Sequence, residues 1–145
     1  AVHRTHGLAE TLAALDAAGP AFAARVRDFL AALPSHLVLD GGRLVVAHAG
    51  LPERYHGRDD RRVRDRALFG ETTGRLDAHG LPERLDWGAA YAGRAVVAYG
   101  HTPVTAPRWS GRTVDLDTGC VFGGALTALR WPELETAAEP ARRAY

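Results

Sequence analysis

The chain has 145 residues, of which 46% are hydrophobic and 24% charged, and its formal net charge is +1. This length fits one globular domain with a core of its own, and the nearly neutral charge excludes a bulk electrostatic attraction to nucleic acids or membranes. The single cysteine, Cys120, excludes an intramolecular disulfide, and no apolar run is long enough to cross a bilayer. We therefore expect a cytoplasmic protein with no membrane partner.

Two helices are predicted at the start of the chain. Apolar residues recur with helical spacing over residues 8–17, with Thr5 as a candidate cap and a Gly-Pro pair as the stop. A second run over residues 21–33 places its apolar side chains on one face and ends at Pro34. We expect these helices to form an αα hairpin that covers a sheet.

Short apolar runs predict that sheet in the rest of the chain. A β-hairpin is expected where residues 37–39 and 44–47 flank an Asp-Gly-Gly turn. Further strands are expected at residues 95–99, 113–116 and 125–131.

The remaining segments are polar and predict little regular structure. Residues 51–91 predict one short helix over 61–68 within a loop region long enough to be functional. Residues 132–145 predict a frayed tail or a linker. The sequence begins at Ala1 and contains no methionine, which favours a piece of a longer protein.

Two apolar runs end in the same way, at a histidine beside small residues. They are residues 45–50 (VVAHAG) and residues 96–103 (VVAYGHTP), which bring His48 and His101 to the ends of predicted strands. The carboxyl edge of a central strand is where α/β folds collect ligands, and imidazole is a common metal ligand. The pattern therefore predicts a pair of metal ligands, although a buried histidine satisfied by hydrogen bonds would look similar at either position. An Asp-x-His pattern at residues 77–79 follows no apolar strand and is interpreted as surface loop.

An aspartate follows the next predicted strand at the same edge. Asp115 and Asp117 share a strand face because side chains alternate, and Asp117 stands beside a glycine turn. It could orient a metal-bound histidine or lie near the metal itself. The alternative is an Asx turn that closes the strand.

Arginines are concentrated in the loop and helix that follow His48. A guanidinium matches phosphate oxygens in shape, and Arg64 or Arg61 is the candidate to contact a phosphate. Interspersed aspartates indicate that most of this run is a solvated face paired with itself.

Several of these runs resemble the calcineurin-like metallophosphoesterases. The runs HAGLP at 48–52 and GHTP at 100–103 look like two histidine motifs of that superfamily. The runs THGLAET at 5–11, LFGETTG at 68–74 and DTGCVFGG at 117–124 look more specifically like the phosphatase module of bacterial polynucleotide kinase-phosphatase. Residues 1–131 would then be the C-terminal part of an α/β metallophosphoesterase domain, a β-sandwich flanked by helices.

The resemblance implies a two-metal phosphoesterase, usually manganese-dependent, with His48 and His101 as metal ligands and Asp117 supporting activity. Its substrates would be 3′-phosphates or 2′,3′-cyclic phosphates on broken RNA or DNA ends. It also allows kinase and ligase domains in the same polypeptide, and a homodimer of the intact protein.

Three upstream motifs of the superfamily, an Asp-x-His, a Gly-Asp-x-x-Asp-Arg-Gly and a Gly-Asn-His, do not occur before His48, and the sequence contains no asparagine. We therefore expect the 145-residue chain to be inactive alone. The alternatives are a phosphoprotein or dinucleotide polyphosphate phosphatase of the same superfamily, and a non-catalytic fragment or scaffold.

Overall fold

The computed structural model describes residues 7–76, 78, 80 and 82–144, and divides the chain into two compact units that meet between Pro34 and Ser35. The sequence analysis expects one domain over residues 1–131 and a tail or linker over residues 132–145, and this division stays a prediction. The helical segment forms one unit, and the second unit extends through the segment that was expected to be a tail.

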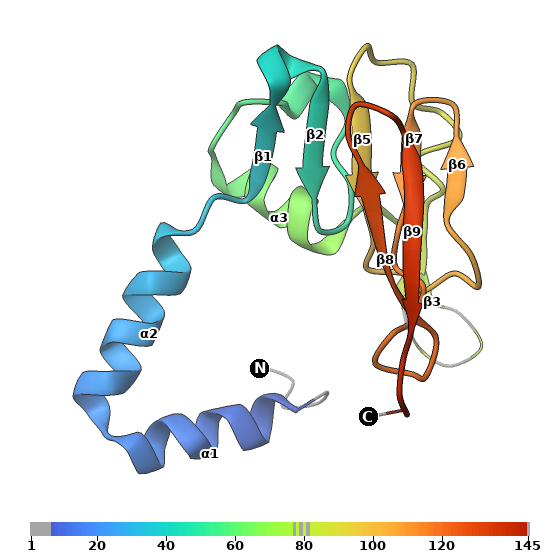
Figure 1. Cartoon of the computed structure of the whole chain (residues 1–145). Helices are drawn as coiled ribbons and strands as arrows, with labels where there is room; N and C mark the ends of the chain where they lie inside the picture. Colours follow the sequence, from blue (N-terminus) through green and yellow to red (C-terminus); the bar gives the residue numbers. More distant parts are fainter. Residues whose placement is uncertain (1–6, 77, 79, 81, 145) are drawn as a thin grey trace. The chain divides into compact units, whose positions relative to one another are not determined.

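The first unit contains α1 (Leu8–Ala18) and α2 (Pro20–Ala32), which confirms both predicted helices. Gly19, with φ of +90°, separates them, and Pro20 begins the second because proline suits the first helical turn. Figure 1 shows the helices meeting at an open angle, so they do not form the expected hairpin. No residue of either helix is buried, and Phe29 is 64% exposed. The predicted cap, Thr5, lies outside the described residues, and whether the helices cover a sheet stays a prediction. Within the described residues, neither these helices nor any other is long and apolar enough to span a membrane.

The second unit is built on a five-stranded sheet in the order β1-β2-β5-β7-β6. Its strands are β1 (His36–Leu39), β2 (Leu44–Ala47), β5 (Val96–Tyr99), β7 (Thr113–Asp115) and β6 (Arg108–Ser110). The three central strands, β2, β5 and β7, run parallel, while β1 and β6 pair antiparallel at the edges. All of these except β6 lie where apolar runs predicted strands.

Other segments of the second unit pack on each face of the central strands. On one face, α3 (Arg61–Phe69) buries Val63 and Ala67 against Leu51 and Tyr55, the last in a 3₁₀ turn at Glu53–Tyr55. The helix begins at its cap, Asp60, whose Oδ1 accepts a hydrogen bond from the Val63 backbone N–H at 3.1 Å.

A second 3₁₀ turn, Asp40–Gly42, joins β1 to β2.

The other face is covered by a hairpin that includes the expected tail. Strand β8 (Ala125–Arg130) pairs in full antiparallel register with β9 (Glu135–Pro140), and Leu129 and Trp131 pack on the core of the central sheet. Residues 135–140 of the segment that was expected to be a tail or linker therefore form a paired strand. Every residue of β9 is exposed, so the strand carries no apolar alternation, and its pairing rests on backbone hydrogen bonds that composition does not reveal.

The polar segment also contains a hairpin that was expected to be loop. Strand β3 (Thr72–Leu76) pairs with β4 (Pro82–Arg84), and nearly all of their side chains are exposed. The segment after β4 folds back so that Trp87 and Tyr91 pack on Val45 and Val97 of the central sheet. Arg84, the last residue of β4, and Asp86, which follows it, line one cavity with His101.

Candidate metal and phosphate site

The three predicted site residues follow three neighbouring parallel strands. His48 comes directly after β2, His101 two residues after β5, and Asp117 two residues after β7. All three line one cavity at the carboxyl edge of the sheet, where parallel α/β sheets place ligands. The predicted convergence of the two imidazoles is therefore confirmed.

The two imidazoles are in direct contact. His101 Nδ1 and His48 Nε2 are 2.9 Å apart, and the ring centroids are 4.7 Å apart at an interplanar angle of 70°. The Gly100 backbone N–H donates to the His48 carbonyl oxygen at 2.9 Å and ties the two strand ends together. The side chains are thus positioned by the sheet itself and do not depend on a long loop.

His101 has an unusual backbone and an unsatisfied ring nitrogen. Its φ of +79° lies in the left-handed region, which side chains other than glycine rarely adopt. Its Nε2 is buried and has no hydrogen-bond partner among the described residues. Burial, the positive charge of Arg84 and the His48 ring lower the pKa of His101, against the opposing effect of Asp117. Strain together with an orphaned donor or acceptor is typical of a residue held in place for a ligand.

Asp117 adopts the Asx turn that was weighed as an alternative. Its Oδ1 accepts the Gly119 backbone N–H at 3.2 Å. Its Cβ lies 2.9 Å from the position where a Cβ on Gly100 would stand, so only glycine fits before His101 without a shift. The aspartate therefore closes β7, packs against the β5 end and lines the cavity that contains both histidines.

The imidazole pair fits a divalent cation, although incompletely. Two nitrogen ligands at about 2.0–2.1 Å from one metal are roughly 3 Å apart when they subtend a right angle at it, which is close to the observed 2.9 Å. Among the described residues, however, no cluster of three or more His, Cys, Asp or Glu side chains could hold a metal ion. This chain therefore supplies part of a metal site, and the role of the histidines as ligands stays a prediction.

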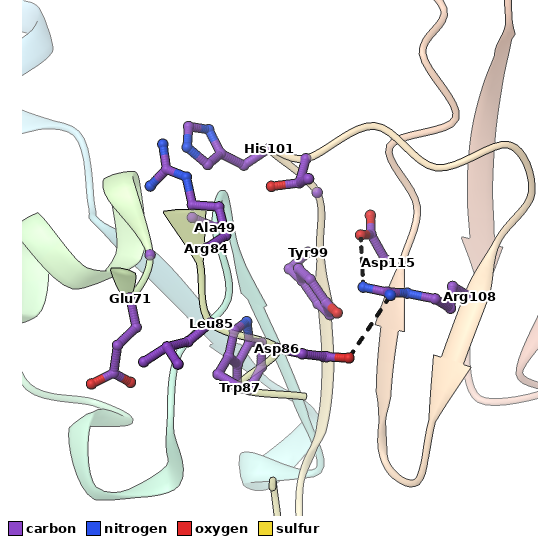
Figure 2. A pocket seen from close by; sticks show the side chains of 13 residues that line it. Ala49, Glu71, Arg84, Leu85, Asp86, Trp87, Tyr99, His101, Arg108 and Asp115 are labelled. Atoms are coloured by element: carbon purple, nitrogen blue, oxygen red, sulfur yellow. Dashed lines mark ion pairs between the residues drawn. The ribbon is translucent and has the colours of Figure 1, made fainter. Parts of the chain in front are cut away.

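The arginine that lies beside His101 is Arg84, and the predicted phosphate contact of Arg64 stays a prediction. Arg84 and His101 line a second cavity, of about 230 Å³, and Figure 2 shows the two side chains together at one end of it. Arg64 lines neither cavity that contains His101. The phase of α3 explains the difference, because Val63 and Ala67 define its buried face and Arg64 is rotated by about 100° from Val63. Arg61 is 95% exposed and pairs with Asp65 at 3.9 Å.

A polar row lies at the other end of the second cavity. Tyr99, Asp115 and Arg108 occupy paired positions on β5, β7 and β6. Figure 2 shows Arg108 between two carboxylates, with Asp115 at 4.0 Å and Asp86 at 3.9 Å. Burial raises the pKa of Asp115, opposed by the hydrogen bond from the Asp117 backbone N–H and by the charge of Arg108. Burial and the Asp115 carboxylate raise the pKa of Tyr99.

The sequence interpretation missed Arg84, Arg108 and the cavity role of Asp115. The alternation of Asp115 with Asp117 was visible, but β6, which brings Arg108 beside Asp115, was not predicted. Asp77 and His79, interpreted as surface loop, lie outside the described residues. Cys120 is a free cysteine, in agreement with the sequence.

The described architecture defines a mixed α/β, metallophosphoesterase-like fold, as expected. A crystal structure described as that of a candidate diadenosine tetraphosphatase superposes with a TM-score of 0.57 and 23% sequence identity, over 81% of this chain and 55% of that one. No protein-family model matches the chain.

Curated relatives give a more specific similarity. The chain is 49% identical over 143 residues to the asymmetrical bis(5′-nucleosyl)-tetraphosphatase PrpE of Geobacillus thermodenitrificans (strain NG80-2), covering 96% of this chain and 58% of that protein. It is 46% identical over 148 residues to the protein of the same name from Geobacillus sp. (strain WCH70), and the match covers 99% of this chain and 60% of that protein. It is 50% identical over 112 residues to the Bacillus subtilis (strain 168) protein of that name, and the match covers 77% of this chain and 46% of that protein. The chain thus spans less than two thirds of the length of these relatives.

Proposed function

We propose that this chain is the part of a metal-dependent phosphoesterase that supplies two imidazole ligands and a phosphate-binding arginine, and that the enzyme hydrolyses dinucleotide polyphosphates. The single observation that carries the proposal is the 2.9 Å contact between His101 Nδ1 and His48 Nε2 at the ends of two parallel strands. The similarity to asymmetrical tetraphosphatases supports the substrate class. Asymmetrical cleavage of a four-phosphate bridge would leave unequal nucleotide products.

His48 and His101 would hold one cation between them. When bound, a divalent metal in such a site polarises a phosphoryl oxygen and lowers the pKa of water. Asp117, fixed by its Asx turn, keeps an acceptor beside His101. Arg84 places a positive charge beside ligands that would themselves hold a cation, an arrangement that favours an anionic group between them. The substrate's phosphates are the natural anion.

The remaining metal ligands would come from polypeptide that this chain does not include. Catalytic zinc sites, for comparison, need about three protein ligands, and the described residues provide two. The curated relatives extend beyond the matched region by about two fifths of their length or more. We infer that this additional portion carries the other ligands. The ligands in that portion would set how many metal ions bind and whether they are manganese.

The resemblance to polynucleotide kinase-phosphatase gave a different substrate, and the comparisons do not support it. The relatives reported above are tetraphosphatases, and a special closeness to the end-repair phosphatases is not shown. Hydrolysis of RNA or DNA ends was our main expectation from the sequence. The alternative, a dinucleotide polyphosphate phosphatase, is the better supported of the two.

The proposal is tested by product analysis on the polypeptide that carries this chain. Purified protein is incubated with bis(5′-adenosyl) tetraphosphate and Mn²⁺, and the products are separated by anion-exchange chromatography. We expect AMP and ATP in equal amounts, and no turnover after chelation of the metal. Release of phosphate from a 3′-phosphorylated oligonucleotide, with the dinucleotide left intact, would restore end repair instead.

Arg84→Ala should lower kcat/KM for the dinucleotide by about 10- to 100-fold, the loss of a charge-assisted hydrogen bond. Arg84→Lys should recover part of that loss, because it retains the charge but not the fork of donors. Arg75→Ala is the matched control, since Arg75 lies on the same hairpin, is 81% exposed and pairs with Glu83 at 3.5 Å. Equal effects of the Arg84 and Arg75 substitutions on steady-state kinetics would contradict the assignment.

A further inference from the structure

The cavity beside the histidines has two chemically different ends. His101 and Arg84 form a basic end, and Tyr99, Asp115, Arg108 and Asp86 form the other. On β5 and β7, Tyr99 and Asp115 lie two residues before His101 and Asp117, which corresponds to about 6–7 Å along a strand. A ligand that binds at the histidines therefore places the group next to its bound part at this second end.

Asp115 carries an acceptor without a donor. Its side chain is 1% exposed, and Oδ1 accepts the Asp117 backbone N–H at 3.1 Å. Its Oδ2 is buried and has no hydrogen-bond partner in the described part of the chain. The Arg108 guanidinium is 4.0 Å away, which is too long for a hydrogen bond. A buried acceptor in this state is unfavourable unless a ligand supplies the missing donor.

The charges decide which part of a dinucleotide polyphosphate fits each end. Asp115 and Asp86 would repel phosphate, whereas Arg84 and a cation on the histidines would attract it. Ionised phosphates offer acceptors only, while a nucleoside offers O–H donors on its ribose and N–H donors on its base. The acceptor of Asp115 therefore suits the nucleoside and not the phosphates.

We propose that the row Tyr99, Asp115 and Arg108 is the nucleoside subsite of this enzyme, in which Asp115 Oδ2 accepts a hydrogen bond from a ribose hydroxyl or an exocyclic amine. The inference rests on the proposed function. Arg108, with a side chain that is 52% exposed, closes the open side of the subsite and offers donors to the acceptors of the nucleoside.

The test measures selectivity in the polypeptide that carries this chain. The ratio of kcat/KM for bis(5′-adenosyl) tetraphosphate to that for p-nitrophenyl phosphate, which has no nucleoside, should fall about 10- to 100-fold in Asp115→Asn. The fall should lie in KM, and AMP titrated calorimetrically should lose affinity by a similar factor. Arg108→Met, at an exposed position, should lower the same ratio. Glu83→Gln, an exposed carboxylate on β4 that lines neither cavity containing His101, should not change it.

Two substrate analogues locate the donor. If the ribose supplies it, the 2′-deoxyadenosyl analogue binds weakly and is indifferent to Asp115→Asn. If the base supplies the donor, the inosyl analogue, which lacks the exocyclic amine, binds weakly and is indifferent to Asp115→Asn. An unchanged ratio in both Asp115→Asn and Arg108→Met would overturn the subsite while wild-type dinucleotide hydrolysis stands. Failure of the wild type to hydrolyse the dinucleotide, with p-nitrophenyl phosphate hydrolysis retained, would instead remove the proposed function and the subsite with it.

The thermal stability of Asp115→Asn distinguishes a binding role of Asp115 from a structural one. The pKa of Asp115 is raised in the fold by burial, so its ionisation destabilises the folded chain as pH rises from the ordinary carboxyl pKa toward the raised one. Tyr99, Arg108, Asp86 and Asp117 face it, and a neutral amide avoids the cost of the buried charge. Asp115→Asn should therefore melt no lower than wild type at pH 7.5. A large loss of stability would assign Asp115 a structural role only.

Discussion

In the polypeptide that carries this chain, His48→Ala and His101→Asn should each reduce turnover by about 10²- to 10³-fold or more, the range seen when a group that stabilises the transition state electrostatically is removed. The two imidazole nitrogens meet at 2.9 Å, so each variant removes one half of the contact. Asparagine is the better replacement at His101, because φ is +79° there and asparagine tolerates left-handed backbone. Calorimetric titration should show weaker Mn²⁺ binding in both variants.

The fold should survive these changes. His48 is exposed, and its backbone contacts at the strand end are kept in the variant. His56→Gln is the matched control, because His56 contacts the Leu51 carbonyl oxygen at 2.8 Å and lines neither cavity of the site. Wild-type activity in His48→Ala would leave the chain as a binding or scaffold piece, the non-catalytic alternative. Wild-type circular dichroism with lost turnover would support the ligand role.

A strand could be predicted from the sequence when burial of its apolar side chains stabilises it, and could not when backbone pairing alone does. Most residues of β2, β5 and β7 are buried, so their apolar runs predicted strands, and the parallel order brought His48 and His101 together as expected. The strands that were missed, β3, β4, β6 and β9, expose most of their side chains. Their pairing depends on backbone hydrogen bonds, which leave little trace in composition.

The site residues divide in the same way. His48, His101 and Asp117 follow predicted strands directly, so local sequence placed them. Arg84 reaches the site through the pairing of β4 with β3, and Arg108 reaches it because β6 pairs with β7. Such long-range arrangements do not appear in any local pattern. Arg64 was a reasonable candidate by residue type, but helix phase selects among neighbouring arginines.

Several positions of the motifs that suggested an end-repair enzyme are glycines set by the backbone, and glycines of this kind do not identify a substrate. In the run DTGCVFGG, a Cβ on Gly124 would stand 2.0 Å from the Thr118 carbonyl oxygen, and Gly119 has φ of +67°. In the run GETTG, Gly70 and Gly74 also have positive φ. Backbone conformation or close backbone approach requires these glycines, whichever substrate is bound. Residues that would contact a nucleoside, such as Asp115 and Arg108, lie outside the glycine positions.

Gly50→Ala should destabilise the protein by about 3–5 kcal/mol, combining a left-handed backbone with an overpacked core. Gly50 has φ of +82°, and an added Cβ would stand 2.0 Å from Trp87 Cζ2. Trp87 cannot yield easily, because Tyr91 and Tyr99 pack edge-on against it at 5.8 and 5.0 Å between centroids. Chemical denaturation with a fluorescence readout measures the loss. Since Gly50 follows His48 by two residues, turnover should fall as well.

Gly57→Ala separates the two causes of that loss. Gly57 has a similar φ of +73°, but no atom lies within 4 Å of its added Cβ, so only the backbone cost of about 1–2 kcal/mol should remain. In Gly50→Ala with Trp87→Leu, the clash is relieved, and the double variant should lose less stability than the two single variants together. Strict additivity would show that Trp87 does not press on Gly50, and that the turn after His48 is held by its backbone alone.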